Sequence, residues 1–183
     1  MASPTIYLLP GWQGSGPGHW QTLWAQRYGD RLVEQDDWEW PRRGDWMSRL
    51  DDVLLSDPSL PARPAWLVAH SLGCHLVAAW AAHSRHVRRV AGALLVAPPD
   101  LLRIDLPPQL HTWRPAVLRQ LPFPAIVVLS QDDPYGSGES GRALARAWGA
   151  RTVDAGARGH LNADSGLGDW PAARGWLHEL MPQ

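Results

Sequence analysis

Two kinds of apolar pattern alternate along this chain. In the first, short apolar runs are closed by glycine, proline or polar residues, as at 6–9, 65–69, 90–96 and 125–129. In the second, apolar residues recur three or four positions apart, as in segments 19–28, 45–54, 71–83, 139–148 and 170–180. The first pattern is typical of buried strands, and the second of helices with one packed face. Two shorter strands are expected at 32–33 and 151–153, so the sequence predicts strands and helices in alternation.

The apolar runs also indicate how the strands are arranged. They are continuous rather than alternating with polar residues, which is typical of a parallel sheet covered on both faces. No linker, internal repeat or low-complexity segment divides the chain. We therefore expect one α/β domain over residues 1–183, with a mostly parallel sheet and helices on both of its faces.

Composition and charge exclude several classes of protein. The formal net charge is −1 and the 17 basic residues form no long run, which argues against binding to nucleic acid or to an anionic membrane surface. The single cysteine, Cys74, excludes an intrachain disulfide and cysteine-rich zinc sites. We see neither a signal peptide nor a run of about 18 apolar residues that could span a membrane. We expect a soluble, cytoplasmic protein.

The chain contains 12 tryptophans, and most are expected in the core, because large aromatic side chains mainly serve burial. Trp66 and Trp80 lie beside apolar runs and are predicted to be buried. Trp12 and Trp38 lie in expected loops and are better candidates for lining a pocket.

The strongest local motif is Ala-His-Ser-Leu-Gly at residues 69–73, between a predicted buried strand and a predicted helix. It is a variant of the G-x-S-x-G nucleophile elbow in which Ala69 occupies the first glycine position. Small residues are needed on both sides of the serine, because the turn brings strand and helix close together. The turn exposes the hydroxyl of Ser71 at a helix N-terminus, where developing negative charge is favoured. A serine that merely caps a helix is the simpler alternative.

A serine hydroxyl needs an adjacent base, and the chain offers one in the expected order of serine, acid and histidine. Asp132 and Asp133 directly follow the strand predicted at 125–129, and His160 lies in a glycine-rich loop after the last strand. Parallel strands bring such loops to one edge of the sheet. Either aspartate is placed to orient the histidine, while the other stabilises the turn before Pro134.

Two backbone N–H groups are expected to bind the oxyanion of the tetrahedral intermediate. Leu72 follows the nucleophile and supplies one of them, and Trp12, in the glycine-rich loop after the first strand, is our candidate for the second. That loop lacks both the G-x-G-x-x-G and the G-K-[ST] pattern, so it carries no nucleotide fingerprint. His19 and Trp20 either shape this loop or begin the following helix.

The other histidines are weaker candidates. His70 and His75 lie close to Ser71 in sequence, but this does not place them close to its hydroxyl. The chain contains no H-E-x-x-H motif, and its histidines lack the spacing of metal ligands. We therefore expect no metal and no cofactor. The expected partner is a small ester or amide substrate, and the sequence does not fix the oligomeric state.

Four stretches together resemble a known family. They are LLPGWQGSGPGHW, DWEWPRRGDWMSRL, VAHSLGCHL, and the late pair SQDDPY and GHLNADSGLGDW. In this order they are similar to the small serine hydrolases related to retinoblastoma-binding protein 9, in the α/β-hydrolase superfamily.

The resemblance implies an α/β-hydrolase core without a large cap domain, and hydrolysis of small esters or amides. It also implies that Ser71, Asp133 and His160 occupy the positions of the family's catalytic residues, which favours Asp133 over Asp132. A retinoblastoma-binding role is not implied, because the segment Leu72-Gly73-Cys74-His75-Leu76 lacks the glutamate of the L-x-C-x-E motif.

Together these observations predict a carboxylesterase-like serine hydrolase that works through an acyl-enzyme. The stretch 100–124 is too short for a full lid domain, so we expect a small, aromatic pocket and short acyl chains. A non-catalytic binding protein on the same scaffold is the alternative from a different class. Acyl transfer, or attack on another kind of bond, is a further alternative for the same three residues.

Overall fold

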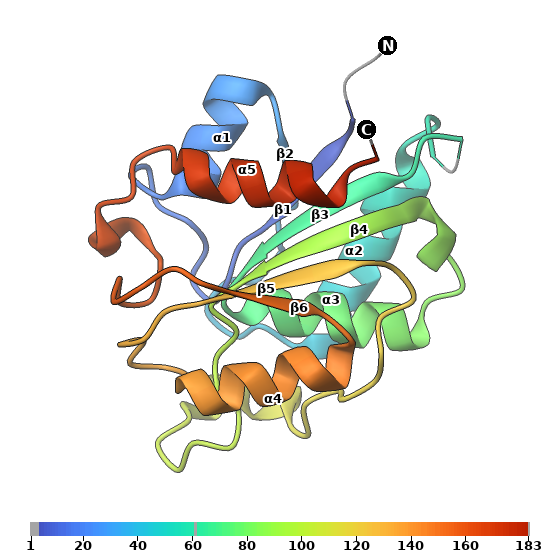
Figure 1. Cartoon of the computed structure of the whole chain (residues 1–183). Helices are drawn as coiled ribbons and strands as arrows, with labels where there is room; N and C mark the ends of the chain where they lie inside the picture. The colour runs from blue at the N-terminus through green and yellow to red at the C-terminus, as the bar shows by residue number, and fades with distance from the viewer. Residues whose placement is uncertain (1–3, 61, 183) are drawn as a thin grey trace.

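A sheet of six strands runs through the centre of the computed structural model of this chain (Figure 1). The structure describes residues 4–60 and 62–182, so residues 1–3, part of the segment in which we see no signal peptide, lie outside it. The strand order is β2-β1-β3-β4-β5-β6, and every pairing between neighbours is parallel. The prediction of a mostly parallel α/β sheet is confirmed.

The strands are β1 (Ile6–Leu9), β2 (Arg31–Leu32), β3 (Ala65–His70), β4 (Val90–Val96), β5 (Ala125–Leu129) and β6 (Arg151–Asp154). The α-helices are α1 (Trp20–Tyr28), α2 (Arg43–Ser56), α3 (Leu72–His83), α4 (Gly138–Trp148) and α5 (Pro171–Leu180). The described residues also form three short 3₁₀ helices, labelled η1 (Val87–Arg89), η2 (Pro108–Trp113) and η3 (Ala163–Ser165). Each strand and each α-helix begins and ends within two residues of the bounds predicted from the sequence.

The sheet is covered on both faces, as predicted. Helices α1 and α5 lie on one face, and α2, α3 and α4 lie on the other (Figure 1). Although the inner strands β1, β3, β4 and β5 are almost entirely apolar, their side chains alternate between two separate cores. Leu8 and Val68 pack with Trp24 in the core beneath α1 and α5. Leu9 and Leu67 belong to the larger core on the opposite face.

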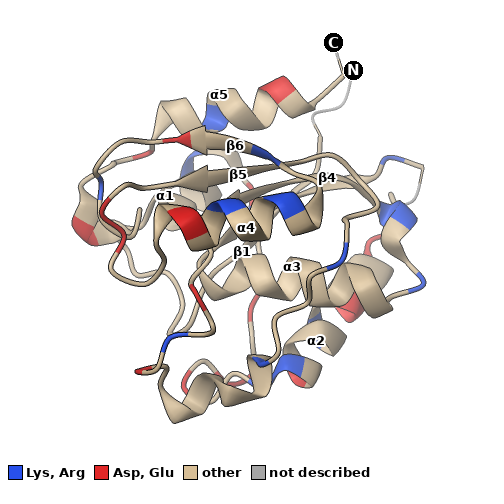
Figure 2. Ribbon diagram, turned by 60° about the horizontal axis from the view of Figure 1, so that its bottom comes forward, with Lys and Arg blue, Asp and Glu red and all other residues tan. Residues whose placement is uncertain are grey.

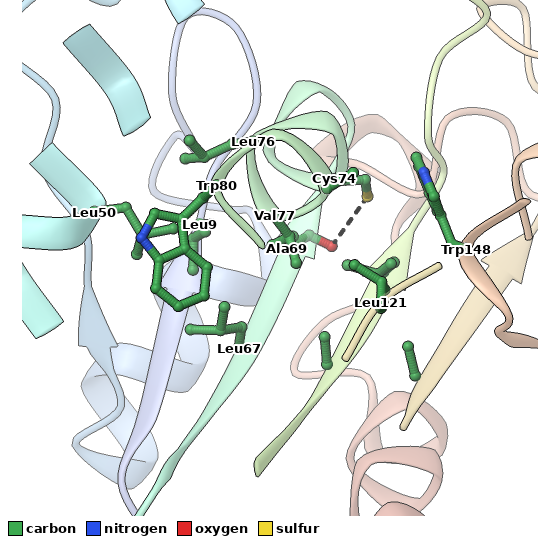
Figure 3. Packing of buried hydrophobic residues seen from close by; sticks show 14 of the residues in the cluster. Leu9, Leu50, Leu67, Ala69, Cys74, Leu76, Val77, Trp80, Leu121 and Trp148 are labelled. Carbon is green, nitrogen blue, oxygen red and sulfur yellow. Dashed lines mark hydrogen bonds between the residues drawn. The ribbon is translucent and has the colours of Figure 1, made fainter. Parts of the chain in front are cut away.

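Helix α3 lies across the larger core and is buried over most of its length, as its alanine- and leucine-rich sequence predicts (Figure 3). Trp80 is 1% exposed, and Leu9 and Leu67 of the sheet belong to the same cluster. The Cys74 thiol donates to the carbonyl of Ala69 at 3.7 Å, within the same core (Figure 3). This packing fixes the helix that begins directly after Ser71.

One detail of the predicted helices is wrong. Asp45 was expected to cap the helix that contains Trp46 and Leu50, but α2 begins at Arg43 and Asp45 lies within its first turn. A carboxylate in the first turn is favoured by the helix dipole without being the cap. The apolar spacing identified the helix, but not the turn at which it begins.

Most charged residues lie outside the sheet (Figure 2), although Asp30 and Asp57 are buried and pair with Arg174 and Arg31. Most lie on loops, at the ends of strands and on the outward faces of the helices, while β3, β4 and β5 carry none. Among the described residues, no helix combines the length and the apolar character that crossing a bilayer requires.

The connections between strands create a crevice at one edge of the sheet. From β1 the chain moves outward to β2, and then returns to place β3 on the other side of β1. In open parallel sheets, ligands bind at such a switch point, beyond the carboxyl ends of the strands. The loop after β1 and the turn after β3, which contains Ser71, therefore meet there.

Candidate active site

Ser71 lies between β3 and α3 on a sharp turn. Its backbone φ is +53°, a value that residues other than glycine rarely adopt, and its N–H donates to the carbonyl of Val96 at 2.8 Å. The turn depends on Gly73, because a Cβ there would lie 2.3 Å from the carbonyl oxygen of Leu9. The side chain of Ala69, in contrast, is accommodated in the core.

His160 connects Ser71 to a carboxylate. The hydroxyl of Ser71 lies 2.9 Å from Nε2 of His160, and both carboxylate oxygens of Asp133 lie 2.9 Å from its Nδ1. The side chains of His160 and Asp133 are 9% and 4% exposed. With the imidazole proton on Nδ1, the ring donates to Asp133 and its Nε2 can accept the proton of Ser71. The structure thus brings the three residues singled out in the sequence into one hydrogen-bonded chain.

The two neighbouring aspartates have different surroundings. Asp133 faces His160 and also accepts from the N–H of Tyr135 at 2.9 Å. Asp132 instead accepts from the N–H of Gly159 at 2.7 Å and from the hydroxyl of Ser130 at 2.9 Å. These two hydrogen bonds lower the pKa of Asp132 and keep it ionised. Asp132 therefore holds the loop that carries the histidine, while Asp133 contacts the imidazole itself.

Two further side chains hold the backbone of the histidine loop. The ring of His70 donates from Nε2 to the carbonyl of His160 at 2.9 Å. The indole of Trp20 donates to the carbonyl of Leu161, also at 2.9 Å. Leu161 has a backbone φ of +52°, so this part of the loop adopts a conformation that needs support from its surroundings.

Two more histidines lie beside His160, and both are kept neutral. Burial, together with the neighbouring His160, lowers the pKa of His19 to about 4. Burial also lowers the pKa of His70 well below its usual value. The rings of His19 and His70 are 4.7 Å apart, and those of His70 and His160 are 4.9 Å apart. Charge that develops on His160 therefore does not meet a second imidazolium.

The loop after β1 forms the wall opposite His160. A Cβ at Gly11 would lie 2.7 Å from the Cβ of Ser71, so glycine is needed where the loop passes Ser71. Neighbouring backbone N–H groups are already used, since that of Gln13 donates to Trp38 and that of Gly14 to Gly11. Trp12 lies between them and lines the pocket. Leu72, as the first residue of α3, presents an N–H at the helix N-terminus.

A pocket of about 400 Å³ opens above Ser71. One side is the loop after β1, and the other is the segment between β4 and β5, which contributes Leu106, Pro107 and Leu110. Arg103 of the same segment pairs with Asp105 and donates to the carbonyl of Pro134, which ties the segment to the loop that contains Asp133. The lining is more mixed than the aromatic pocket predicted, because apolar and charged side chains share this wall.

The outcome differs among the aromatic candidates. Trp12 lines the pocket, whereas Trp38 packs over Gly14 and against Trp46, where it supports the loop from behind. His19 fulfils both of its alternatives, because it caps α1 by accepting from the N–H of Gln21 and holds the loop by donating from its backbone N–H to the carbonyl of Gly16 at 3.0 Å. It also lines the pocket.

Sequence reasoning ranked His70 below His160 and did not consider Tyr135, yet the structure places both beside His160. The ring of Tyr135 lies 4.6 Å from the ring of His160. The sequence did contain information on where the His70 side chain points. Because side chains alternate along a strand, residue 70 points to the same face as Val68, where the first helix packs. Tyr135 lies in an irregular loop, and no periodic pattern predicts where its side chain points.

Cys74 is not a candidate nucleophile, because burial raises the pKa of its thiol well above the usual value. Within residues 4–60 and 62–182, no group of three or more histidine, cysteine, aspartate or glutamate side chains is arranged to hold a metal ion.

Comparison with known proteins gives a match over nearly the whole chain. The model of a family described as serine hydrolase matches residues 6–179. No curated protein matches the chain.

Several solved structures share the fold. A YdeN-like hydrolase from Pectobacterium atrosepticum is 26% identical, with a TM-score of 0.79 over 98% of this chain and 94% of that one. The ydeN gene product of Bacillus subtilis is 22% identical, with a TM-score of 0.75 over 97% and 98%. The esterase RhEst1 from Rhodococcus sp. is 17% identical, with a TM-score of 0.70 over 98% and 92%.

Proposed function

Because the chain belongs to the serine hydrolase family, we propose that it cleaves small carboxylic esters through an acyl-enzyme formed on Ser71. The observation that carries this proposal is the unbroken chain of hydrogen bonds from Asp133 through His160 to Ser71, each 2.9 Å long. A hydroxyl held by a base, with the base held by a third group, is the arrangement that activates serine as a nucleophile.

In the first half of the reaction, the Oγ of Ser71 attacks the ester carbonyl carbon while Nε2 of His160 takes the hydroxyl proton. Asp133 accepts from Nδ1 and stabilises the imidazolium that forms. The tetrahedral intermediate collapses when the carbon–oxygen bond to the leaving group breaks. His160 returns its proton to that oxygen, and the alcohol departs.

In the second half, water takes the place of the alcohol. His160 removes a proton from the water as its oxygen attacks the acyl carbon, and a second tetrahedral intermediate forms. Its collapse breaks the bond to Oγ, and His160 returns the proton to Ser71. A carboxylic acid leaves, and the hydroxyl is restored.

Negative charge on the carbonyl oxygen is stabilised by the backbone N–H groups of Leu72 and Trp12 in this scheme. The N-terminus of α3 supports the first of these positions, because the helix dipole favours negative charge there. Gly11 supports the second, since without a side chain it lets the loop pass next to Ser71.

The size of the pocket favours small substrates. Its volume of about 400 Å³ lies near the lower end of the range for ligand pockets, roughly 300–1,000 Å³. The segment from Leu106 to Leu110 gives the acyl group an apolar wall. We therefore propose short acyl chains rather than long lipids as the preferred class.

A panel of p-nitrophenyl esters with increasing acyl length tests this proposal. We expect kcat/KM to be highest for acetate to butyrate and to fall for longer chains that exceed the pocket. Ser71→Ala is expected to remove nearly all turnover while it leaves the thermal unfolding temperature close to that of the wild type. Equal turnover by the variant would contradict the assignment of Ser71, and a flat profile would contradict the proposed size limit.

A further inference from the structure

One buried side chain connects the nucleophile to the base. His70 directly precedes Ser71, and its side chain donates from Nε2 to the carbonyl oxygen of His160 at 2.9 Å. The residue is 5% exposed. We propose that His70 is a positioning residue for the reaction, which holds His160 at hydrogen-bond distance from Ser71. The inference rests on the proposed function, in which these two residues exchange a proton.

The tautomer of His70 follows from its partner. A carbonyl oxygen only accepts hydrogen bonds, so Nε2 of His70 must carry the proton. His70 therefore acts as a fixed donor. It takes no part in proton transfer, because its hydrogen bond goes to the main chain of His160 and not to the reacting ring nitrogen.

The carbonyl that His70 holds belongs to a peptide unit that needs support. The next residue, Leu161, has a backbone φ of +52°, which residues with a side chain rarely adopt. Neighbouring residues are held from elsewhere, Gly159 by Asp132 and Leu161 by Trp20. Those two contacts hold the loop against other parts of the protein. His70, in contrast, is bonded in the chain directly to Ser71, so its contact links the loop to the nucleophile. The contact made by His70 therefore sets the separation between the two reacting groups.

The surroundings of His70 leave its ring little freedom to turn. The ring lies between those of His19 and His160, at 4.7 and 4.9 Å between centroids. On the third side lies the ring of Trp20, at 6.3 Å. A donor packed in this way is preorganised, so the position of His160 is fixed before substrate binds.

A matched pair of substitutions separates the donor from the packing. His70→Gln places an amide N–H near the position of the imidazole Nε2, whereas His70→Met has a similar unbranched shape without a donor. With p-nitrophenyl acetate, we expect His70→Met to lower kcat by about 10- to 100-fold, because small displacements of a reacting group are costly. Although His70 borders the pocket, its donor is used by the main chain of His160 and not by the substrate, so KM should change by less than kcat. His70→Gln should recover most of the lost kcat.

Three results would overturn the proposal. The first is an unchanged kcat in His70→Met. The second is an equal loss in both variants at equal thermal stability, which would mean that only the imidazole shape matters. The third is a larger effect on KM than on kcat.

A crystal structure of the His70→Met variant tests positioning without relying on turnover. We expect the carbonyl of His160 to shift and the separation between its Nε2 and the Oγ of Ser71 to exceed hydrogen-bond range. If the wild type hydrolyses no ester, the proposed function fails, and the structure of the variant still decides the role of His70. If the geometry of His160 is unchanged in the variant, the positioning role is refuted, whatever the wild type does.

Discussion

Asp132 and Asp133 are adjacent in sequence and have the same side chain, but they contact different groups. Asp133 meets the imidazole of His160, while Asp132 accepts from the backbone of Gly159 in the same loop. Sequence reasoning from the residues left both open, because the direction of each side chain depends on the turn after Leu129. The resemblance to a family favoured Asp133, which is the residue that contacts the histidine in the structure.

Substitution of each aspartate by asparagine tests this division. Asp133→Asn should lower kcat on the order of 10⁴-fold, because the amide favours the wrong tautomer of His160. Asp132→Asn keeps an oxygen that accepts from Gly159, so we expect a loss below about tenfold, the effect of weakening one hydrogen bond. Steady-state kinetics on one ester measures both variants. Similar losses in the two would contradict the assignment.

His75 illustrates a histidine that serves stability. It is buried, donates from Nε2 to the carbonyl of Pro99 at 2.8 Å, and has a pKa lowered by burial to about 4. Between about pH 6.5 and 4, the unfolded chain binds a proton at this residue that the folded protein does not. The free energy of unfolding therefore falls as the pH drops through this window.

We expect His75→Gln, which keeps a donor near the position of Nε2, to lose less stability on acidification. Between pH 7 and pH 5, the free energy of unfolding should decrease by about 2 kcal/mol less in the variant than in the wild type. His19 and His70 remain in the variant and retain their own contribution to the drop. Urea denaturation at the two pH values measures the difference, and identical drops would exclude His75 as a source.

At the scale of elements, the apolar runs predicted the four inner strands β1, β3, β4 and β5, because a strand buried on both faces has few polar positions. The edge strands β2 and β6 are short and partly exposed, and the sequence indicated them less strongly. The starts of helices were less predictable. Asp45 has the chemistry of a helix cap, but α2 begins at Arg43. The irregular segments were the least predictable, and they contain Tyr135 and the pocket wall at Arg103, Asp105 and Leu106. Their positions depend on tertiary contacts that leave no periodic pattern.

The close approach of α3 to β1 gives a prediction at this scale. Gly73→Ala would place a Cβ 2.3 Å from the backbone of Leu9, so the helix must move, and we expect a loss of about 1–3 kcal/mol in the free energy of unfolding. Gly175 in α5 is the control, because a Cβ there meets nothing within 4 Å. Gly175→Ala should stabilise the protein by up to about 1 kcal/mol. Equal effects in chemical denaturation would contradict this account of the elbow.

At the scale of the whole molecule, the order of the motifs along the chain was more informative than any one motif. The loop after β1, the elbow after β3, the acids after β5 and the histidine after β6 all lie at the carboxyl ends of parallel strands. The resemblance to small serine hydrolases of the α/β-hydrolase superfamily is confirmed by the family match and by the structural similarity to YdeN-like proteins. The size and lining of the pocket could not be derived in this way, because they come from segments without regular structure.

The most direct test of the central claim is to trap the acyl-enzyme itself. After rapid mixing with p-nitrophenyl acetate and acid quenching, mass spectrometry of peptides should find one acetyl group, carried by Ser71. Asp133→Asn should acquire it far more slowly, and Ser71→Ala should acquire none. Turnover of the ester without an adduct, or with the acetyl group on another residue, would contradict nucleophilic catalysis by Ser71.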